Sequence, residues 1–234
     1  MRLVALDLDG TLLNPGGIIA EETIREMQRL YDRGTYIAIA TGRQYPVTRR
    51  LMFDNGLRGR GFPQILISDE REAYFLEGDD YTSWLPWNKK AREKEASLID
   101  ISRTVANEMA HTHSSEFLIN NDFMQKDRGF VEIFYWSVEM AEEAFPFFVE
   151  RLQNTQIKPV RNNRLIALRW EEIGKELILA KVARHLGLAD DEILAVGDSY
   201  NDLGMLKRFN AATTDNADAE VKAAVQEKDG IIAS

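Results

Sequence analysis

The amino-acid sequence predicts an α/β protein with a doubly wound, mostly parallel sheet and an inserted α+β domain. Short apolar segments recur near both ends of the chain, and helical patterns separate them. Between about residues 72 and 171 aromatic residues are more frequent, and strand patterns come in antiparallel-looking pairs. The expected domains are therefore a core of residues 1–71 and 172–234 and an insert of residues 72–171.

The first half of the core begins with a strand, a helix and a second strand. The apolar runs at residues 3–6 and 36–40 predict buried strands, because a parallel sheet covered on both faces needs apolar strands. Apolar residues at helical spacing predict a helix over residues 21–33, and Gly34 stands where a helix often ends. A strand–helix–strand order implies a right-handed crossover and parallel pairing. Residues 64–68 predict a third strand.

The insert and the rest of the core follow from the same patterns. In the insert we expect two helix–strand–strand units after a hairpin-like start, over residues 73–85, 92–109, 116–119, 129–136, 139–153, 157–161 and 165–170. In the returning core we expect a helix, a strand and a short last strand, over residues 177–187, 192–196 and 230–232.

Composition restricts the possible partners and chemistry. A formal net charge of −9 repels nucleic acid and anionic lipid, so neither is expected as a partner. The chain contains no cysteine, which removes disulfides, thiolate metal sites and cysteine nucleophiles. No apolar run is long enough to span a membrane, and the apolar segment before Asp7 is too short for a signal peptide. We expect a cytoplasmic protein whose oligomeric state the sequence does not reveal.

The first chemical motif is Asp7-Leu8-Asp9-Gly10-Thr11, directly after the first strand. Ligands of open α/β sheets bind at the carboxyl ends of the strands. Both carboxylates face one cavity if the backbone curls, and Gly10 permits that curl. Close carboxylates need a cation or a shared proton, and Mg²⁺ suits oxygen ligands. One Asp then attacks phosphorus while the other transfers protons; a lone Asp here would more often be a turn or cap.

The second motif is Gly197-Asp198-Ser199-Tyr200-Asn201-Asp202, which also follows a buried strand. If a helix begins near Ser199, Asp198 and Asp202 both point back toward the strand end. A simpler role for Ser199 is a helix N-cap. Together with the first motif, the loop predicts a cation site.

Two weaker signals lie between these motifs. Thr41-Gly42-Arg43 follows the second strand, where a hydroxyl and backbone amides suit a phosphate group. Taken alone, this tripeptide is more often a capped turn with a solvent-facing Arg. Lys175 alone is an ordinary surface charge, and only its order relative to the other three motifs gives it meaning.

Taken in chain order, the four motifs that begin at Asp7, Thr41, Lys175 and Gly197 resemble those of the haloacid dehalogenase (HAD) superfamily. The chain leaves 131 residues between Arg43 and Lys175, and this long insert is similar to the type IIB cap of Cof-like phosphatases. The resemblance implies a Rossmann-like core, a cap domain that sets substrate specificity, and a phosphoric monoester hydrolase. The implied partner is a small phosphorylated metabolite, such as a sugar phosphate or phosphoglycolate.

The resemblance also assigns roles to residues. It makes Asp7 the nucleophile and Asp9 the general acid and base, while Thr41 and Lys175 hold the phosphoryl group. It places Mg²⁺ on Asp7, the backbone carbonyl of Asp9 and Asp198, with support from Asp202. Two glycines, a hydroxyl, a guanidinium and an amide complete the implied phosphate-binding set: Gly10, Thr11, Gly42, Arg43 and Asn201. Asn201 either contacts the phosphoryl group or orients Lys175.

The chain departs from the family pattern at two places. Many relatives have Ser-Asn-Gly after the third strand, where this chain has Ser68-Asp69-Glu70. Many also have Gly after the motif Lys, where Glu176 stands here. The alternatives to a phosphatase are a sugar-phosphate mutase of the same superfamily and a non-catalytic relative that only binds a ligand.

Overall fold

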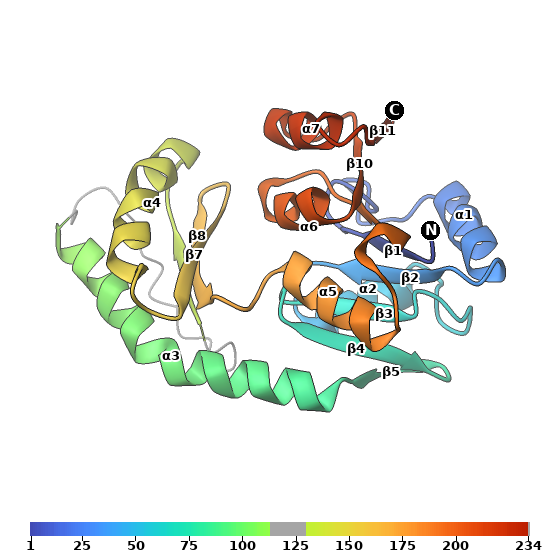
Figure 1. Cartoon of the computed structure of the whole chain (residues 1–234), viewed down its shortest axis with the longest axis horizontal. Coiled ribbons are helices and arrows are strands. Elements are labelled where there is room, and N and C mark those ends of the chain that lie inside the picture. Colours follow the sequence, from blue (N-terminus) through green and yellow to red (C-terminus); the bar gives the residue numbers. More distant parts are fainter. Residues whose placement is uncertain (113–129, 234) are drawn as a thin grey trace. The chain divides into compact units, whose positions relative to one another are not determined.

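The structure, a computed structural model, describes residues 1–112 and 130–233, with side chains omitted at 111 and 112. Its residues form two compact units, one of Met1–Asn88 with Gly174–Ser234 and the other of Lys89–Ile173 (Figure 1). Each unit has its own sheet. None of the helices in the described ranges combines the length and the apolar character that crossing a membrane requires.

The first unit is built on an eight-stranded sheet with the order β11-β10-β9-β1-β2-β3-β4-β5. Six strands are parallel: β1 (Leu3–Leu6), β2 (Tyr36–Ala40), β3 (Ile65–Ser68), β9 (Ile193–Val196), β10 (Asn210–Thr214) and β11 (Ile231–Ala233). The strands β4 (Glu72–Glu77) and β5 (Asp80–Ser83) add an antiparallel edge. The predicted fold class, a doubly wound, mostly parallel sheet with an α+β insert, is confirmed.

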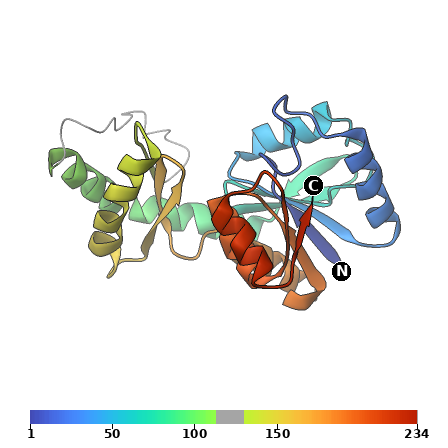
Figure 2. The same cartoon turned by 90° about the horizontal axis from the view of Figure 1, so that it is seen from above.

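Helices cover both faces of this sheet. Figure 2 shows the early helices of this unit, in blue, on one side of the sheet and the late helices, in orange to red, on the other. They are α1 (Glu21–Asp32), α2 (Tyr45–Asp54), α5 (Lys175–His185), α6 (Leu203–Arg208) and α7 (Ala219–Gln226). On the first side, Ile24, Met27 and Met52 of α1 and α2 pack with Ile37 and Leu66 of the sheet. The apolar positions of α1 therefore serve the core, as their helical spacing predicts.

The start of the insert differs from the expected position. The sequence places it at residue 72, whereas the contacts place the division after Asn88. The reason is that β4 pairs with β3, with Ile65 opposite Phe75, and the hairpin buries Tyr74 and Tyr81 against the core of the first unit. The sequence pattern predicts a hairpin here, and the structure has one, but its strand β4 pairs with β3 of the main sheet. The second division, after Ile173, lies two residues from the expected one.

The second unit contains helices packed on a three-stranded antiparallel sheet. The strand order is β6-β8-β7, from β6 (Val131–Phe134), β8 (Leu165–Trp170) and β7 (Ile157–Asn162). The helix α4 (Val138–Leu152) packs on β7 and β8, and α3 (Leu85–Thr112) begins in the first unit and continues into this one. The strand expected at residues 116–119 lies outside the described residues.

Candidate active site

The predicted site residues meet at one edge of the main sheet. Asp7 directly follows β1, and Thr41 directly follows β2. Because β1 pairs in parallel with both β2 and β9, the loops after these strands lie side by side. The loop after β9 begins at Gly197, so the motifs that begin at Asp7, Thr41 and Gly197 share the edge where such sheets bind ligands.

Lys175 connects the nucleophile candidate to the acidic loop. It is the first residue of α5, and its Nζ donates hydrogen bonds of 2.7 Å to Oδ1 of Asp7 and 2.7 Å to Oδ1 of Asp202. Lys175 is only 1% exposed, Asp7 4% and Asp202 0%. A buried ammonium normally destabilises a fold, so its two carboxylate partners are a structural requirement.

Burial dominates the electrostatics of this cluster. It raises the pKa of Asp7 from 3.8 to about 7; the Lys175 ammonium opposes that rise, and the Asp202 carboxylate adds to it. Burial by itself lowers the pKa of Lys175, but the carboxylates of Asp202 and Asp7 outweigh burial and raise it overall. Lys175 therefore stays charged, and the cluster is short of positive charge.

The acidic loop is folded around Asp202. Its Oδ2 accepts hydrogen bonds from the backbone amides of Asp198 and Ser199, at 3.1 Å each, which fixes the loop at the end of β9. Ser199 occupies the N-cap position of the short 3₁₀ turn η2 (Tyr200–Asp202), but its hydroxyl does not cap the turn and donates instead to Oδ1 of Asn201 at 2.6 Å. A Cβ at Gly197 would lie 2.4 Å from Cγ of Asp202, so the Asp202 side chain can occupy this place only because residue 197 is a glycine.

The first motif contacts the acidic loop through Asp198. Thr11 Oγ1 donates a 2.8 Å hydrogen bond to Oδ1 of Asp198. Gly10 has φ +83°, and a Cβ there would lie 2.2 Å from Oδ2 of Asp198. Only glycine tolerates both that conformation and that approach. The curl attributed to Gly10 from the sequence is thus present and brings the two motifs together.

Asp7, Asp198 and Asp202 could together hold a metal ion. One carboxylate oxygen from each lies within 4.8 Å of the others. Burial also raises the pKa of Asp198. Three carboxylates around one ammonium form an all-oxygen donor set with excess negative charge, which fits Mg²⁺. The side chain of Asp9 is not in this group. The family resemblance assigns the metal to the backbone carbonyl of Asp9, which stays a prediction.

The side chain of Asp9 points to a different partner. Arg43 donates two hydrogen bonds to it, from Nε to Oδ2 at 2.7 Å and from Nη2 to Oδ1 at 2.6 Å. Asp9 is the first cause of a raised pKa for Arg43. The pair lines a cavity of about 780 Å³ in the first unit, whose other polar side chains are Thr11, Asn14, Thr23, Thr214 and Asn216. The general-acid candidate Asp9 therefore lines a cavity, whereas the nucleophile candidate Asp7 is buried.

The tripeptide after β2 folds as a tight loop. Thr41 is 1% exposed, and its Oγ1 accepts a 3.1 Å hydrogen bond from the amide of Arg43. The hydroxyl thus lies at the same strand edge as Asp7. The guanidinium of Arg43 is bound to Asp9, but the Arg43 side chain is still 41% exposed, so a capped turn with a solvent-facing Arg also describes this tripeptide.

Glu70 is the site residue that the sequence did not assign. Its Oε1 accepts a 2.8 Å hydrogen bond from Nδ2 of Asn201, one of the predicted phosphate-binding residues. The only sequence signal was its departure from the Asn-Gly that many relatives carry after the third strand.

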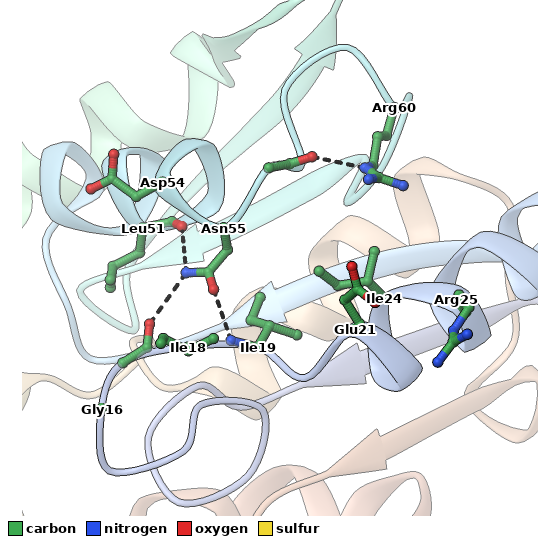
Figure 3. Close-up of a pocket in the computed structure, with 12 residues that line it drawn as sticks. Gly16, Ile18, Ile19, Glu21, Ile24, Arg25, Leu51, Asp54, Asn55 and Arg60 are labelled. Atoms are coloured by element: carbon green, nitrogen blue, oxygen red, sulfur yellow. Dashed lines mark hydrogen bonds between the residues drawn. The ribbon is translucent and has the colours of Figure 1, made fainter.

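A second cavity of about 740 Å³ shares Gly16, Gly17 and Ile18 with the cavity beside Asp9 (Figure 3). It is lined by residues 16–19 and by parts of α1 and α2. Figure 3 shows Asn55 at its centre, where Oδ1 accepts from the amide of Ile19 at 2.7 Å and Nδ2 donates to Leu51 at 2.9 Å. None of the predicted site residues lines this cavity, and Asn55 has a structural role in it.

The structure has close relatives in fold. It superposes with a TM-score of 0.74 on the sucrose-phosphatase of Synechocystis sp. PCC6803, covering 100% of this chain and 93% of that one at 19% identity. A haloacid dehalogenase-like hydrolase from B. subtilis gives a TM-score of 0.67 over 99% of this chain and 95% of that one, at 18% identity. These structures share the fold.

Sequence comparison extends the relationship to phosphatases. The chain is 23% identical to the 5-amino-6-(5-phospho-D-ribitylamino)uracil phosphatase of Bacillus subtilis, over 88% of this chain and 80% of that protein. It is 24% identical to phosphoglycolate phosphatase 1 of Saccharolobus solfataricus, over 95% of this chain and 86% of that protein. The predicted enzyme class, a phosphoric monoester hydrolase, is confirmed. A family model described as haloacid dehalogenase-like hydrolase matches residues 4–66 and 64–228. The chain therefore belongs to the haloacid dehalogenase-like hydrolases, as its motifs suggest.

Proposed function

We propose that this enzyme is a Mg²⁺-dependent phosphatase that hydrolyses a small phosphomonoester through an aspartyl-phosphate on Asp7. The observation that supports this most is the buried cluster at the end of β1, where Lys175 lies 2.7 Å from the carboxylates of both Asp7 and Asp202. It places a nucleophile, a fixed positive charge and a set of metal-ligand oxygens within one site. Mg²⁺ bound by Asp7, Asp198 and the Asp9 carbonyl, with Asp202 in support, would supply further positive charge to the transferring phosphoryl group.

The reaction has two steps at phosphorus. In the first, a carboxylate oxygen of Asp7 forms a bond to phosphorus while the bond to the leaving oxygen breaks, and Asp9 gives that oxygen its proton. In the second, Asp9 removes a proton from water as the water oxygen attacks phosphorus. The bond between Asp7 and phosphorus then breaks and releases phosphate. Because Lys175 donates to Oδ1 of Asp7, we assign the attack to Oδ2.

Arg43 controls when Asp9 becomes available. Both carboxylate oxygens of Asp9 accept hydrogen bonds from the guanidinium, whereas a general acid and base must contact the leaving oxygen and then the attacking water. Arg43 must therefore release Asp9 when the substrate binds. The dianionic phosphoryl group is the natural new partner of the guanidinium, and Thr41 with the Gly42 amide holds the same group from the other side.

The substrate class is a small phosphorylated metabolite. Relatives include phosphoglycolate phosphatases and a phosphatase that acts on a phosphoribityl compound. The polar cavity beside Asp9 suits a hydroxylated or carboxylated leaving group, such as a sugar phosphate or phosphoglycolate. Cap residues are proposed to set the choice among them.

The first test is phosphate release from a panel of sugar phosphates, phosphoglycolate and nucleotide monophosphates, with Mg²⁺ and with EDTA. We expect release from a subset of the panel with Mg²⁺ and none with EDTA. Dependence on an added bisphosphate with little free phosphate would support the mutase instead. A folded protein that releases no phosphate from any compound would support the binding alternative.

Arg43→Met is expected to lower kcat/KM by roughly 10- to 100-fold, because a charge-assisted hydrogen bond to the phosphoryl group is lost. The increase in KM should account for most of the change. Arg49→Met is the matched control, because Arg49 forms the same kind of two-bonded pair with Asp80, with similar exposure, elsewhere in the first unit. Equal kinetics for the two variants would contradict the role of Arg43. Steady-state assays on the best panel substrate measure the difference.

A further inference from the structure

The loop after β3 adopts a conformation that its residues disfavour. Asp69 has φ 55° and Glu70 has φ 53°, which is the left-handed region. Residues with a Cβ rarely adopt it, and glycine does so freely. Two such residues in succession persist only where the surroundings hold them, and strain of this kind concentrates at functional sites.

Backbone hydrogen bonds attach this loop to two motif segments. The amide of Glu70 donates to the carbonyl of Thr41 at 3.1 Å, and the amide of Asp69 donates to the carbonyl of Arg43 at 2.9 Å. The carbonyl of Glu70 accepts from the amide of Gly174 at 3.1 Å, next to Lys175. These bonds join the loop after β2 to the start of α5, and a glycine at position 70 would preserve all of them.

The Glu70 side chain makes the contact that a glycine lacks. Its Oε1 accepts from Nδ2 of Asn201 at 2.8 Å, while Oδ1 of Asn201 accepts from Oγ of Ser199 at 2.6 Å. The Asn201 amide is therefore oriented from both ends. An amide nitrogen carries two hydrogens, and we assign the one that Glu70 does not use to a phosphoryl oxygen.

The Glu70 carboxylate also lies beside the phosphate loop. A Cβ built on Gly42 would be 3.5 Å from Oε1 of Glu70. A negative charge at this place repels an inorganic phosphate ion bound at Thr41 and Gly42. The charge therefore favours release of the product.

We propose that Glu70 is a positioning residue that orients Asn201 toward the phosphoryl group and whose charge limits the affinity of the site for product phosphate. This inference rests on the proposed function, because it assumes that phosphate binds at Thr41 and Gly42. It explains why a Glu stands at a position whose backbone conformation favours glycine, because the side chain makes a contact that glycine cannot make.

Glu70→Gly separates function from folding. Removing the Cβ relieves the strained φ, so the variant should melt roughly 1–4 °C higher. Its kcat/KM should fall by roughly 10- to 100-fold, because the hydrogen bond of a charged group to Asn201 is lost. Asp229→Gly is the matched control: Asp229 is acidic, exposed, has φ 53° and lies in the same unit, after α7. It should melt higher with unchanged kinetics.

Glu70→Gln tests the charge alone. Gln keeps an acceptor for Asn201, so activity should stay within about 3-fold, while the inhibition constant of inorganic phosphate falls by about 3-fold or more. Asp69→Asn removes the neighbouring charge and should leave that constant unchanged.

If Glu70→Gly has the kinetics and the phosphate inhibition of the wild type, Glu70 is not a positioning residue and the inference is overturned. If Glu70→Gly melts below the wild type, Glu70→Gln decides, and an unchanged phosphate constant there overturns the inference. If the wild type releases no phosphate, the proposed function fails separately, and titration calorimetry with inorganic phosphate and Mg²⁺ still compares wild type with Glu70→Gln.

Discussion

Asp7→Asn is expected to abolish phosphate release, with kcat lower by on the order of 10⁴- to 10⁶-fold. An amide has no anionic oxygen to attack phosphorus, so the covalent step is lost rather than slowed. Asn has nearly the same shape as Asp, and the buried position at the end of β1 remains filled. The measurement is phosphate release with Mg²⁺, together with acid quenching to trap labelled enzyme, which only the wild type should yield.

The control for this experiment is an Asp outside the site. Asp190→Asn removes an exposed carboxylate that pairs with Arg208 at 2.8 Å, and it should keep full activity. Thermal melts show whether both variants are folded. Full activity of Asp7→Asn in a preparation free of other phosphatases would contradict the aspartyl-phosphate mechanism.

The parts of the site that follow strands directly were predictable from the sequence. A buried parallel strand is a continuous apolar run, so the run before Asp7 and the run before Thr41 reveal both the strand and the edge where it ends. Gly10 was predictable for a related reason, because a curl at that place requires φ above zero, and its φ is +83°. These features depend on the conformation of a few consecutive residues, and the types of those residues determine that conformation.

Contacts between distant segments were not predictable in this way. Lys175 lies 168 residues from Asp7 in the sequence, and no local pattern marks a lysine that will be buried. It was identified only through the order of the family motifs. The hairpin of β4 and β5 shows the same limit, because a hairpin pattern does not state which sheet its edge will join. The role of Glu70 could not be predicted for a third reason. Its side chain contacts Asn201, 131 residues away, and it does so from a backbone conformation that its residue type disfavours.

Lys175→Met is expected to destabilise the metal-free enzyme by about 3–5 kcal/mol and to remove its activity. The substitution keeps the volume of the side chain but leaves the carboxylates of Asp7 and Asp202 buried without their partner. Removing one member of a buried ion pair costs far more than removing a surface pair, because the remaining charge is not solvated. Denaturant unfolding in EDTA measures the loss, and phosphate release measures the activity.

Lys181→Met supplies the comparison within the same helix. Its ammonium lies 4.4 Å from the centre of the Trp87 ring and takes no part in the acidic cluster, so its loss should cost at most about 2 kcal/mol and leave kinetics unchanged. Mg²⁺ should restore part of the stability of Lys175→Met, because a cation bound among the three carboxylates replaces some of the missing positive charge. It should not restore activity, since the ammonium that contacts the nucleophile is still absent. If Lys175→Met is as stable as Lys181→Met in EDTA, the buried carboxylates do not need the Lys175 ammonium. That result would contradict the prediction that this buried ion pair stabilises the fold.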